Sequence, residues 1–261
     1  MDNLFAENIK IGKNTVIEKN AVIRGINGKA KNIVIGDNCY IGEFVQIICD
    51  EFTLGDYSKI QHHTNIHGYK PCSIGHNAWI GQYTIIDSIG GVSIGNNCGV
   101  GAHSQLWSHI KYGDTLEGCR FLSEKEMNIG NDVWFVGHCI VSPIVAEDKS
   151  MAMAGSVVTK DMKYNEIYAG SPAKSISDKV GHQFVERSLD EKMEMMRTYL
   201  QSFGNDDQIL LVDKEADIHF DDDKTYFNIA DRKYKKTGSD IEISFMKFLL
   251  PAKAKFVPYI N

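Results

Sequence analysis

Histidine is the residue type best able to do chemistry in this chain, and one histidine stands apart from the rest. His109 lies on a long stretch, 107–128 (WSHIKYGDTLEGCRFLSEKEMN), that interrupts an otherwise regular pattern. An imidazole exchanges a proton near neutral pH, which suits a general base. A long excursion without periodicity of its own is typical of a functional segment. His109 is therefore the leading candidate for a catalytic residue.

A second group of histidines lies earlier in the chain. His62, His63 and His67 occur together in QHHTNIHG, and His103 and His138 follow at wider spacing. Three neutral imidazoles and a bound water make a sound zinc-hydroxide catalyst, so zinc chemistry is an alternative. We favour a structural role for this group, as wall and turn residues near a binding pocket, and expect no metal.

The elements that must position these residues follow from a six-residue repeat. An aliphatic residue, often followed by glycine, recurs at this period, as in Ile35-Gly36, Ile41-Gly42 and Ile47, and again in Ile94-Gly95, Val100-Gly101 and Leu106. Because six is a multiple of two, every marked residue points to the same side of an extended strand. The glycine and the Asn or Asp after it supply turn residues.

One strand and one turn for every six residues give a flat wall, and three walls close a triangular coil. About seven such coils stack into a column, a parallel β-helix over residues 1–180, and residues 107–128 project from this column as a loop. The fold class predicted is mainly β. A helix is excluded because positions i, i+6 and i+12 drift around a 3.6-residue period.

The last third of the chain, 181–261, lacks the six-residue repeat and has other patterns of apolar residues. Apolar residues at helical spacing and a Ser188/Glu191 capping box predict a helix over 188–203. Alternating segments at 209–212, 216–220, 225–230 and 240–250 predict strands of a small antiparallel unit. We therefore expect a helix followed by a small α+β appendage.

Charge and cysteine content narrow the function. A net charge of −6 argues against general nucleic-acid binding, which needs a basic face. No run of eighteen apolar residues or secretory signal is present, so no membrane span is predicted and a cytoplasmic protein is expected. The six cysteines form no CxxC pair and sit in apolar repeats, which predicts reduced, buried thiols.

The sequence resembles a known family between residues 83 and 174. VSIGNNCGVGAHSQLWSH, MNIGNDVWFVGHCIVSP, AGSVVTKDM and YAGSPAK, in that order, are similar to the hexapeptide-repeat galactoside, maltose and sugar-nucleotide acetyltransferases. The resemblance implies a left-handed β-helix that works as a homotrimer. It implies transfer of an acetyl group from acetyl-CoA to a hydroxyl or amine of a sugar or nucleotide-linked sugar, as in polysaccharide biosynthesis. It also implies that His109 takes the acceptor's proton.

The same resemblance suggests which residues meet the two substrates. Asp87, in the insertion IIDSIGGVSIG, matches an acidic residue that contacts the sugar, and Tyr83, Gln105 and Trp107 are further acceptor-site candidates. Acetyl-CoA would lie along the last coils. Its pantetheine arm would pass the small residues, its phosphates would meet the lysines, and an indole would shape the thioester channel. The candidates for this cofactor site are Ala154, Gly155, Thr159, Lys160, Lys174 and Trp134.

Two other functions stay open from the sequence. A γ-class carbonic anhydrase shares the β-helix and holds zinc by three histidines, and a non-catalytic β-helix scaffold would use the appendage to bind a partner. A six-residue repeat is strong evidence for the fold but weak evidence for the function. The histidine on the long excursion before IGNDVW favours the acetyltransferase.

Overall fold

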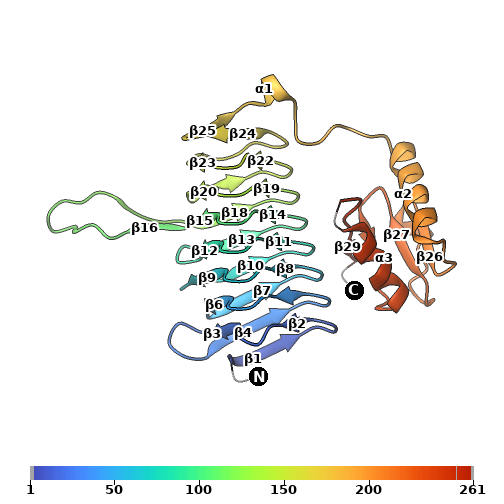
Figure 1. Cartoon of the computed structure of the whole chain (residues 1–261), viewed down its shortest axis with the longest axis horizontal. Helices are drawn as coiled ribbons and strands as arrows, with labels where there is room; N and C mark the ends of the chain where they lie inside the picture. The colour runs from blue at the N-terminus through green and yellow to red at the C-terminus, as the bar shows by residue number, and fades with distance from the viewer. Residues whose placement is uncertain (1–2, 251, 260–261) are drawn as a thin grey trace. The chain divides into compact units, whose positions relative to one another are not determined.

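The computed structural model describes residues 3–250 and 252–259. The chain divides into two compact units, the first ending at Phe184 and the second beginning at Val185. The first unit is a left-handed parallel β-helix, as predicted, in which short strands stack into three walls (Figure 1).

We call the three walls A, B and C, and each is a ladder of parallel strands. In each coil the chain forms a strand of wall B first, then one of wall C and then one of wall A. Wall A contains β3 (Val22–Arg24), β6 (Gln46–Cys49), β9 (Asn65–Gly68), β12 (Ile85–Asp87), β15 (Gln105–Leu106), β20 (Ile140–Val141) and β23 (Val157–Val158). Wall B contains β1 (Leu4–Ile11), β4 (Ala30–Ile35), β7 (Glu51–Leu54), β10 (Cys72–Ile74), β13 (Val92–Ile94), β18 (Met127–Ile129) and β21 (Val145–Ala146).

Wall C contains β2 (Val16–Ile17), β5 (Tyr40–Ile41), β8 (Lys59–Ile60), β11 (Trp79–Ile80), β14 (Gly99–Val100), β19 (Trp134–Phe135), β22 (Met151–Ala152) and β24 (Ile167–Gly170). The antiparallel strand β25 (Ala173–Ser175) pairs with β24, and the short helix α1 (Ser177–Val180) follows it. Strand β1 pairs with both β3 and β4, so it joins walls A and B at the first coil.

The aliphatic residues of the repeat form the core. On wall A, Ile47, Ile66, Ile86 and Leu106 lie in register on successive strands and are fully buried. Burying an aliphatic side chain of this size contributes about 1.5–3 kcal/mol relative to leaving it exposed. Glycine follows the aliphatic residue because coils approach closely there: a Cβ on Gly101 would lie 1.9 Å from the carbonyl oxygen of Val136.

The excursion at 107–128 is more regular than predicted. Its middle forms a β-hairpin of two antiparallel strands, β16 (His109–Lys111) and β17 (Leu122–Glu124), that projects from the column (Figure 1). Its two ends stay in the column, since the Trp107 N–H donates to Val141 and Met127 begins β18. The hairpin escaped prediction because its strands are short and their apolar residues do not alternate.

The second unit confirms the predicted helix and corrects two of the four predicted strands. Helix α2 (Leu189–Phe203) begins at Ser188, whose capping box with Glu191 is present. The segments at 209–212 and 225–230 contain β26 (Ile209–Val212) and β27 (Thr225–Asn228), whereas 216–220 holds a 3-10 turn, η1 (Glu215–Asp217). The segment at 240–250 is helix α3 (Asp240–Leu249), so that strand prediction was wrong.

The small sheet of this unit is mixed rather than antiparallel. Strand β26 pairs with β27 in parallel, β27 pairs with β28 (Lys233–Tyr234) in antiparallel fashion, and β28 pairs with β29 (Val257–Pro258) in parallel. Helix α3 supplies crossover length between β28 and β29, which a parallel pairing requires.

Candidate active site

Asp87 and His109, from separate coils, form a short hydrogen bond. Nδ1 of His109 lies 2.6 Å from Oδ2 of Asp87. Asp87 ends β12 and His109 begins β16, so the pair lies at the corner where wall A turns into wall B. The Asp87 side chain is fully buried, whereas that of His109 is 20% exposed. The imidazole therefore stands between a buried carboxylate and solvent.

The Asp87 carboxylate is held from several sides. The backbone N–H and the hydroxyl of Ser108 both donate to Oδ2, at 2.9 and 3.1 Å, and the N–H of Ile89 donates to Oδ1 at 3.3 Å. The Ser108 hydroxyl also accepts from Gly90 N–H at 2.8 Å. These bonds fix the carboxylate in place and satisfy its lone pairs, as burial requires.

This environment sets the tautomer of His109. A carboxylate only accepts hydrogen bonds, so the imidazole donates from Nδ1, and Nε2 carries the lone pair in the neutral ring. A base whose second nitrogen is fixed by a carboxylate is the arrangement that general-base catalysis uses. The pair is therefore able to take a proton from a ligand that reaches Nε2.

The predicted acceptor-site residues fall into two places. Trp107 and Gln105 lie beside the pair: Nε1 of Trp107 donates to Oε1 of Gln105 at 3.2 Å, and the Trp107 and His109 rings are 6.4 Å apart between centroids. Asp87 was expected to contact the sugar, but its carboxylate is fully buried and bonded to the chain itself. Asp87 therefore lies on the buried side of the His109 imidazole.

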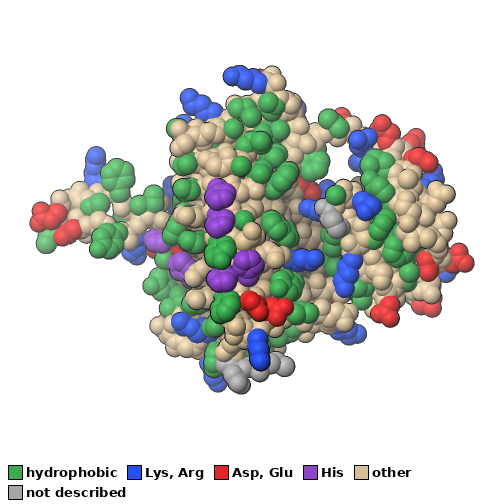
Figure 2. All heavy atoms as spheres, in the orientation of Figure 1, with side chains coloured by type: hydrophobic (Ala, Val, Ile, Leu, Met, Phe, Trp, Pro, Cys, Tyr) green, Lys and Arg blue, Asp and Glu red, His purple; other side chains and the backbone are tan. Residues whose placement is uncertain are grey.

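Tyr83 lies in the turn that precedes β12, the strand that ends at Asp87. Tyr83 belongs instead to a row of rings on the corner between walls C and A. The row consists of Phe44, His63, Tyr83, His103 and His138, and its successive centroids are 4.9, 4.9, 5.1 and 4.8 Å apart. Figure 2 shows histidine side chains gathered along one edge of the column.

The predicted cofactor-site residues are distributed over the last coils. Trp134 is exposed on wall C, with its indole over Gly99, and Ala154 and Gly155 form the turn between walls C and A. Thr159 and Lys160 follow β23, and Lys174 lies on β25; all three side chains are exposed. Within one chain these residues therefore lie on several faces, and their cofactor role stays a prediction.

A cavity of about 330 Å³ lies against wall A below the Asp87–His109 pair. His67 lines it, and His67 Nε2 is 4.0 Å from Oδ1 of Asp87, while its Nδ1 is 3.0 Å from Oδ1 of Asn65. The remaining lining is Ile26, Ile48, Asn65, Gly68, Tyr69 and Ile89. The pair thus has an adjacent space with apolar walls and a polar side formed by His67 and Asn65.

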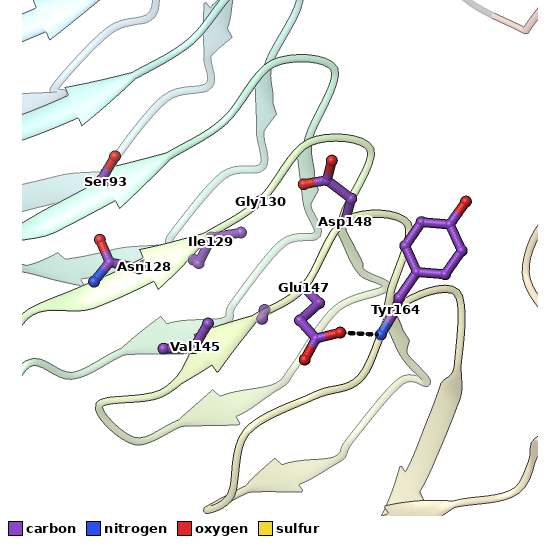
Figure 3. Close-up of a pocket in the computed structure, with 9 residues that line it drawn as sticks. Ser93, Asn128, Ile129, Gly130, Val145, Glu147, Asp148 and Tyr164 are labelled. Carbon is purple, nitrogen blue, oxygen red and sulfur yellow. Dashed lines mark hydrogen bonds between the residues drawn. The ribbon is translucent and has the colours of Figure 1, made fainter.

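A second cavity, of about 430 Å³, lies on wall B and contains no histidine (Figure 3). Its polar lining includes Glu147 and Asp148. Glu147 accepts from the Lys163 ammonium and from Tyr164 N–H, each at 2.9 Å, and these bonds lower the pKa of Glu147. Asp148 accepts from Asn131 N–H at 2.7 Å. Two carboxylates repel a phosphorylated ligand, so this cavity is the weaker candidate.

The histidines that suggested zinc are placed mainly in the ring row. Nδ1 of His62 lies 3.0 Å from Nδ1 of His63. Within residues 3–250 and 252–259, no three His, Cys, Asp or Glu side chains are grouped so as to hold a metal ion. No helix in the same part of the chain is long and apolar enough to cross a membrane.

Sequence reasoning missed two participants in this site. Ser108 was not selected as a site residue, although its N–H and hydroxyl hold the carboxylate. His67 was grouped with the other histidines, although its ring faces Asp87. The strand offset provided a usable signal: β12 and β15 pair Ile86 with Leu106, which places Asp87 opposite Trp107 and next to Ser108.

Fold and site together define a hexapeptide-repeat β-helix with a hydrogen-bonded Asp–His pair at an insertion. No family model matches the chain. It is similar to the bifunctional protein GlmU of Anaplasma marginale (strain Florida), 36% identical over 103 residues, covering 38% of this chain and 23% of that protein. It is also similar to the galactoside O-acetyltransferase of Escherichia coli K12, 40% identical over 53 residues, covering 20% and 26%.

The chain thus spans about a quarter of the length of each of these relatives. Among solved structures, it shares its fold with a point mutant of AntD, an N-acyltransferase from Bacillus cereus in complex with dTDP-4-amino-4,6-dideoxyglucose and coenzyme A. That likeness has a TM-score of 0.51 and 17% identity, and it covers 76% of this chain and 92% of AntD. The resemblance to hexapeptide-repeat acetyltransferases is confirmed.

Proposed function

We propose that the chain is an acetyltransferase that moves an acetyl group from acetyl-CoA to a hydroxyl or amine of a sugar or nucleotide-linked sugar. The observation that carries this proposal is the 2.6 Å bond between Asp87 and His109, whose side chain is 20% exposed. The relatives named as acetyltransferases support the same chemistry.

In the proposed reaction, Nε2 of His109 takes the proton of the acceptor hydroxyl or amine as its oxygen or nitrogen attacks the thioester carbonyl. Asp87 holds the ring and stabilises the imidazolium that forms. The tetrahedral adduct collapses, the carbon–sulfur bond breaks, and the proton passes from His109 to the coenzyme A thiolate. Both substrates bound together make a covalent enzyme intermediate unnecessary.

The remaining parts of the proposal concern the cofactor and the assembly. Lys160 and Lys174 are exposed cations suited to the phosphates of acetyl-CoA. At Gly155 a Cβ would meet nothing within 4 Å, which leaves open space beside the backbone for the pantetheine arm. Because these residues do not converge on His109 within one chain, we propose a homotrimer with sites between adjacent columns. The free cysteines favour a reducing, cytoplasmic setting.

The test is release of the coenzyme A thiol from acetyl-CoA with a panel of sugars and sugar nucleotides. We expect release that depends on acceptor, and a rise in melting temperature with acetyl-CoA, because a ligand that binds only the native state stabilises it. Stabilisation by zinc that a chelator reverses, without thiol release, would support the hydratase instead. No response to either ligand would support a scaffold.

A further inference from the structure

Two imidazoles face different oxygens of the buried Asp87 carboxylate. His109 reaches Oδ2 at 2.6 Å from the hairpin, and His67 lies on the neighbouring strand β9, with its Nε2 4.0 Å from Oδ1. The pairing of β9 with β12 sets His67 directly beside Asp87. The carboxylate is fully buried, whereas the His67 and His109 side chains are 40% and 20% exposed. One buried negative charge therefore faces two groups that can each take a proton from solvent.

The two oxygens of this carboxylate differ in the donors that they already have. Oδ2 accepts from His109 Nδ1 and from the N–H and hydroxyl of Ser108, whereas Oδ1 accepts from Ile89 N–H at 3.3 Å. Among the described residues, His67 and His109 are the side chains within ion-pair distance of the carboxylate. Each carboxylate oxygen accepts about two hydrogen bonds, so Oδ1 has capacity for a further donor on the side of His67.

Asn65 determines which nitrogen of His67 carries its first proton. Nδ1 of His67 lies 3.0 Å from Oδ1 of Asn65, and because an amide oxygen only accepts, Nδ1 is the donor. In the neutral ring, the lone pair of Nε2 then faces the Asp87 carboxylate, and the two repel each other. A second proton, on Nε2, replaces this repulsion by attraction between an imidazolium and a carboxylate. Protonation of His67 therefore reverses the sign of its interaction with Asp87.

His67 lies at the corner where wall A turns into wall B, and four connections there carry insertions. These are residues 25–29 after β3, 69–71 after β9, 88–91 after β12 and the hairpin after β15. Besides Asp87 and His109, the charged or titratable side chains that the neighbouring elements bring toward His67 are Arg24, Cys49, Asp50, Tyr69, Lys70 and Glu124.

Of these surrounding groups, none replaces Asp87 as the partner of His67. In the described part of the chain, Asp87 is the carboxylate within ion-pair distance of His67, and the Glu124 carboxylate lies 3.6 Å from the Lys70 ammonium. Burial raises the pKa of the Cys49 thiol to about 11, so that group is neutral over the pH range in which an imidazole exchanges its proton. Asp87 is therefore the charge that a protonated His67 offsets.

A proton on one ring changes what Asp87 offers to the other. The carboxylate stabilises an imidazolium at His109 through its negative charge. When His67 already carries a second proton, that charge is partly offset, and the added positive charge also disfavours protonation of His109. The two rings therefore bind their protons in coupled steps, each opposing the other.

We propose that His67 is a positioning residue that regulates the base through Asp87. As the pH falls, Nε2 of His67 takes a proton from solvent, the imidazolium offsets the charge of Asp87, and His109 stays unprotonated. This inference rests on the proposed function, in which neutral His109 is the base. His67 contacts no reacting atom in this scheme. Its effect is to keep the base available at a more acidic pH than an Asp–His pair alone would allow.

The experiment follows the ring signals of His109 by NMR, in protein labelled with ¹³C-histidine, as the pH is varied across the imidazole range. His109→Asn identifies the signal. In the wild type, we expect a titration curve broader than that of one independent proton. In His67→Gln, the curve narrows and its midpoint rises by about half to one pH unit, because the offsetting charge is gone and both rings are partly screened by solvent. His67→Lys keeps a positive charge beside Asp87, so its midpoint stays at or below that of the wild type.

The acid limb of kcat/KM for thiol release should move in the same direction. Its midpoint rises in His67→Gln and does not rise in His67→Lys, while kcat on the alkaline plateau changes by less than about twofold. A residue with only a structural role would lower the plateau and leave the midpoint in place. His182→Gln replaces an exposed histidine that follows α1, and this matched control moves neither midpoint.

A His109 midpoint that stays in place in His67→Gln, or that rises equally in His67→Gln and His67→Lys, would overturn the inference. If neither variant folds, the wild type decides, since a His109 curve that follows one independent proton would overturn the inference as well. The NMR titration needs no turnover. A protein that releases no thiol with any acceptor would therefore refute the proposed function, whereas the coupling of the two rings is judged separately.

Discussion

The two ends of wall A meet the rest of the column in different ways. At the corner with wall C, successive turns keep the six-residue period, and five of them, from Phe44 to His138, place a ring residue in the left-handed region, with φ of 51–59°. At the corner with wall B, four connections carry longer insertions, three of which contribute residues to a cavity, and the Asp87–His109 pair lies at the same corner. The regular corner stabilises stacking, whereas the interrupted corner carries the candidate site.

At the corner between walls C and A, contact between the rings compensates for strain in the backbone. A non-glycine residue at positive φ is unfavourable, and asparagine tolerates it best. Stacking between neighbouring rings offsets part of this cost, about 0.5–1.5 kcal/mol for a pair. At the interrupted corner, the corresponding stabilisation comes from hydrogen bonds to a buried carboxylate. Substitutions at the two corners should therefore have effects of different kinds.

The largest effect on activity should come from Asp87→Asn. The amide is uncharged and no longer stabilises the imidazolium that forms on His109, so kcat should fall by at least about 10²-fold. Asp56→Asn is the matched control, because Asp56 is also buried but lies between walls B and C and accepts from Asp37 N–H through one oxygen. Comparable losses of kcat in both variants would show that burial, and not the site, explains the effect.

A smaller effect, on stability alone, should come from His103. His103→Val places a β-branched residue at φ 59° and removes the ring that faces Tyr83 and His138, so the free energy of unfolding should fall by about 2 kcal/mol. His103→Asn keeps a residue suited to that conformation and should lose about 1 kcal/mol. Urea denaturation monitored by circular dichroism compares them. If both variants unfold at the same urea concentration, backbone strain does not matter at this corner.

The smallest perturbation is alkylation of the cysteines. Burial raises the pKa of the Cys39 thiol to about 12 and that of Cys49 to about 11, so both are neutral thiols at pH 8 and react slowly. Cys119, on the projecting hairpin, is only partly buried. Iodoacetamide at pH 8 should therefore add one group, at Cys119, as mass spectrometry would show. Rapid modification of Cys39 in the folded protein would mean that the column opens readily.

Much of the column could be predicted from sequence, because a period of six fixes which side chains turn inward. Helix α2 could also be predicted, because Ser188 and Glu191 form a recognisable capping box. Helix α3 was not, since Ile241, Ile243 and Phe245 alternate as in a strand. There the Ser239 hydroxyl accepts from Glu242 N–H, and helical spacing of the buried residues decides the structure. Capping and tertiary burial therefore outweighed the strand-like alternation of the local sequence.

The candidate site was predictable residue by residue but not as an arrangement. His109 and Asp87 were both selected, yet the expectation that Asp87 faces a sugar depended on knowing where the insertion folds. The register of β12 with β15 brings Ser108 and His109 over the carboxylate and buries it. Similarly, nothing in the local sequence says that four insertions share one corner, because that follows only from counting coils through every break.

The most direct test of the central claim is the kcat of His109→Asn in acetyl-CoA thiol release with its best acceptor. If His109 is the base, kcat should fall by about 10²–10⁴-fold. The dissociation constant for acetyl-CoA and the unfolding curve should stay close to wild type, because the side chain is at the surface end of the pair. A variant that retains most of the wild-type kcat would contradict the account and leave acyl transfer here without a histidine base.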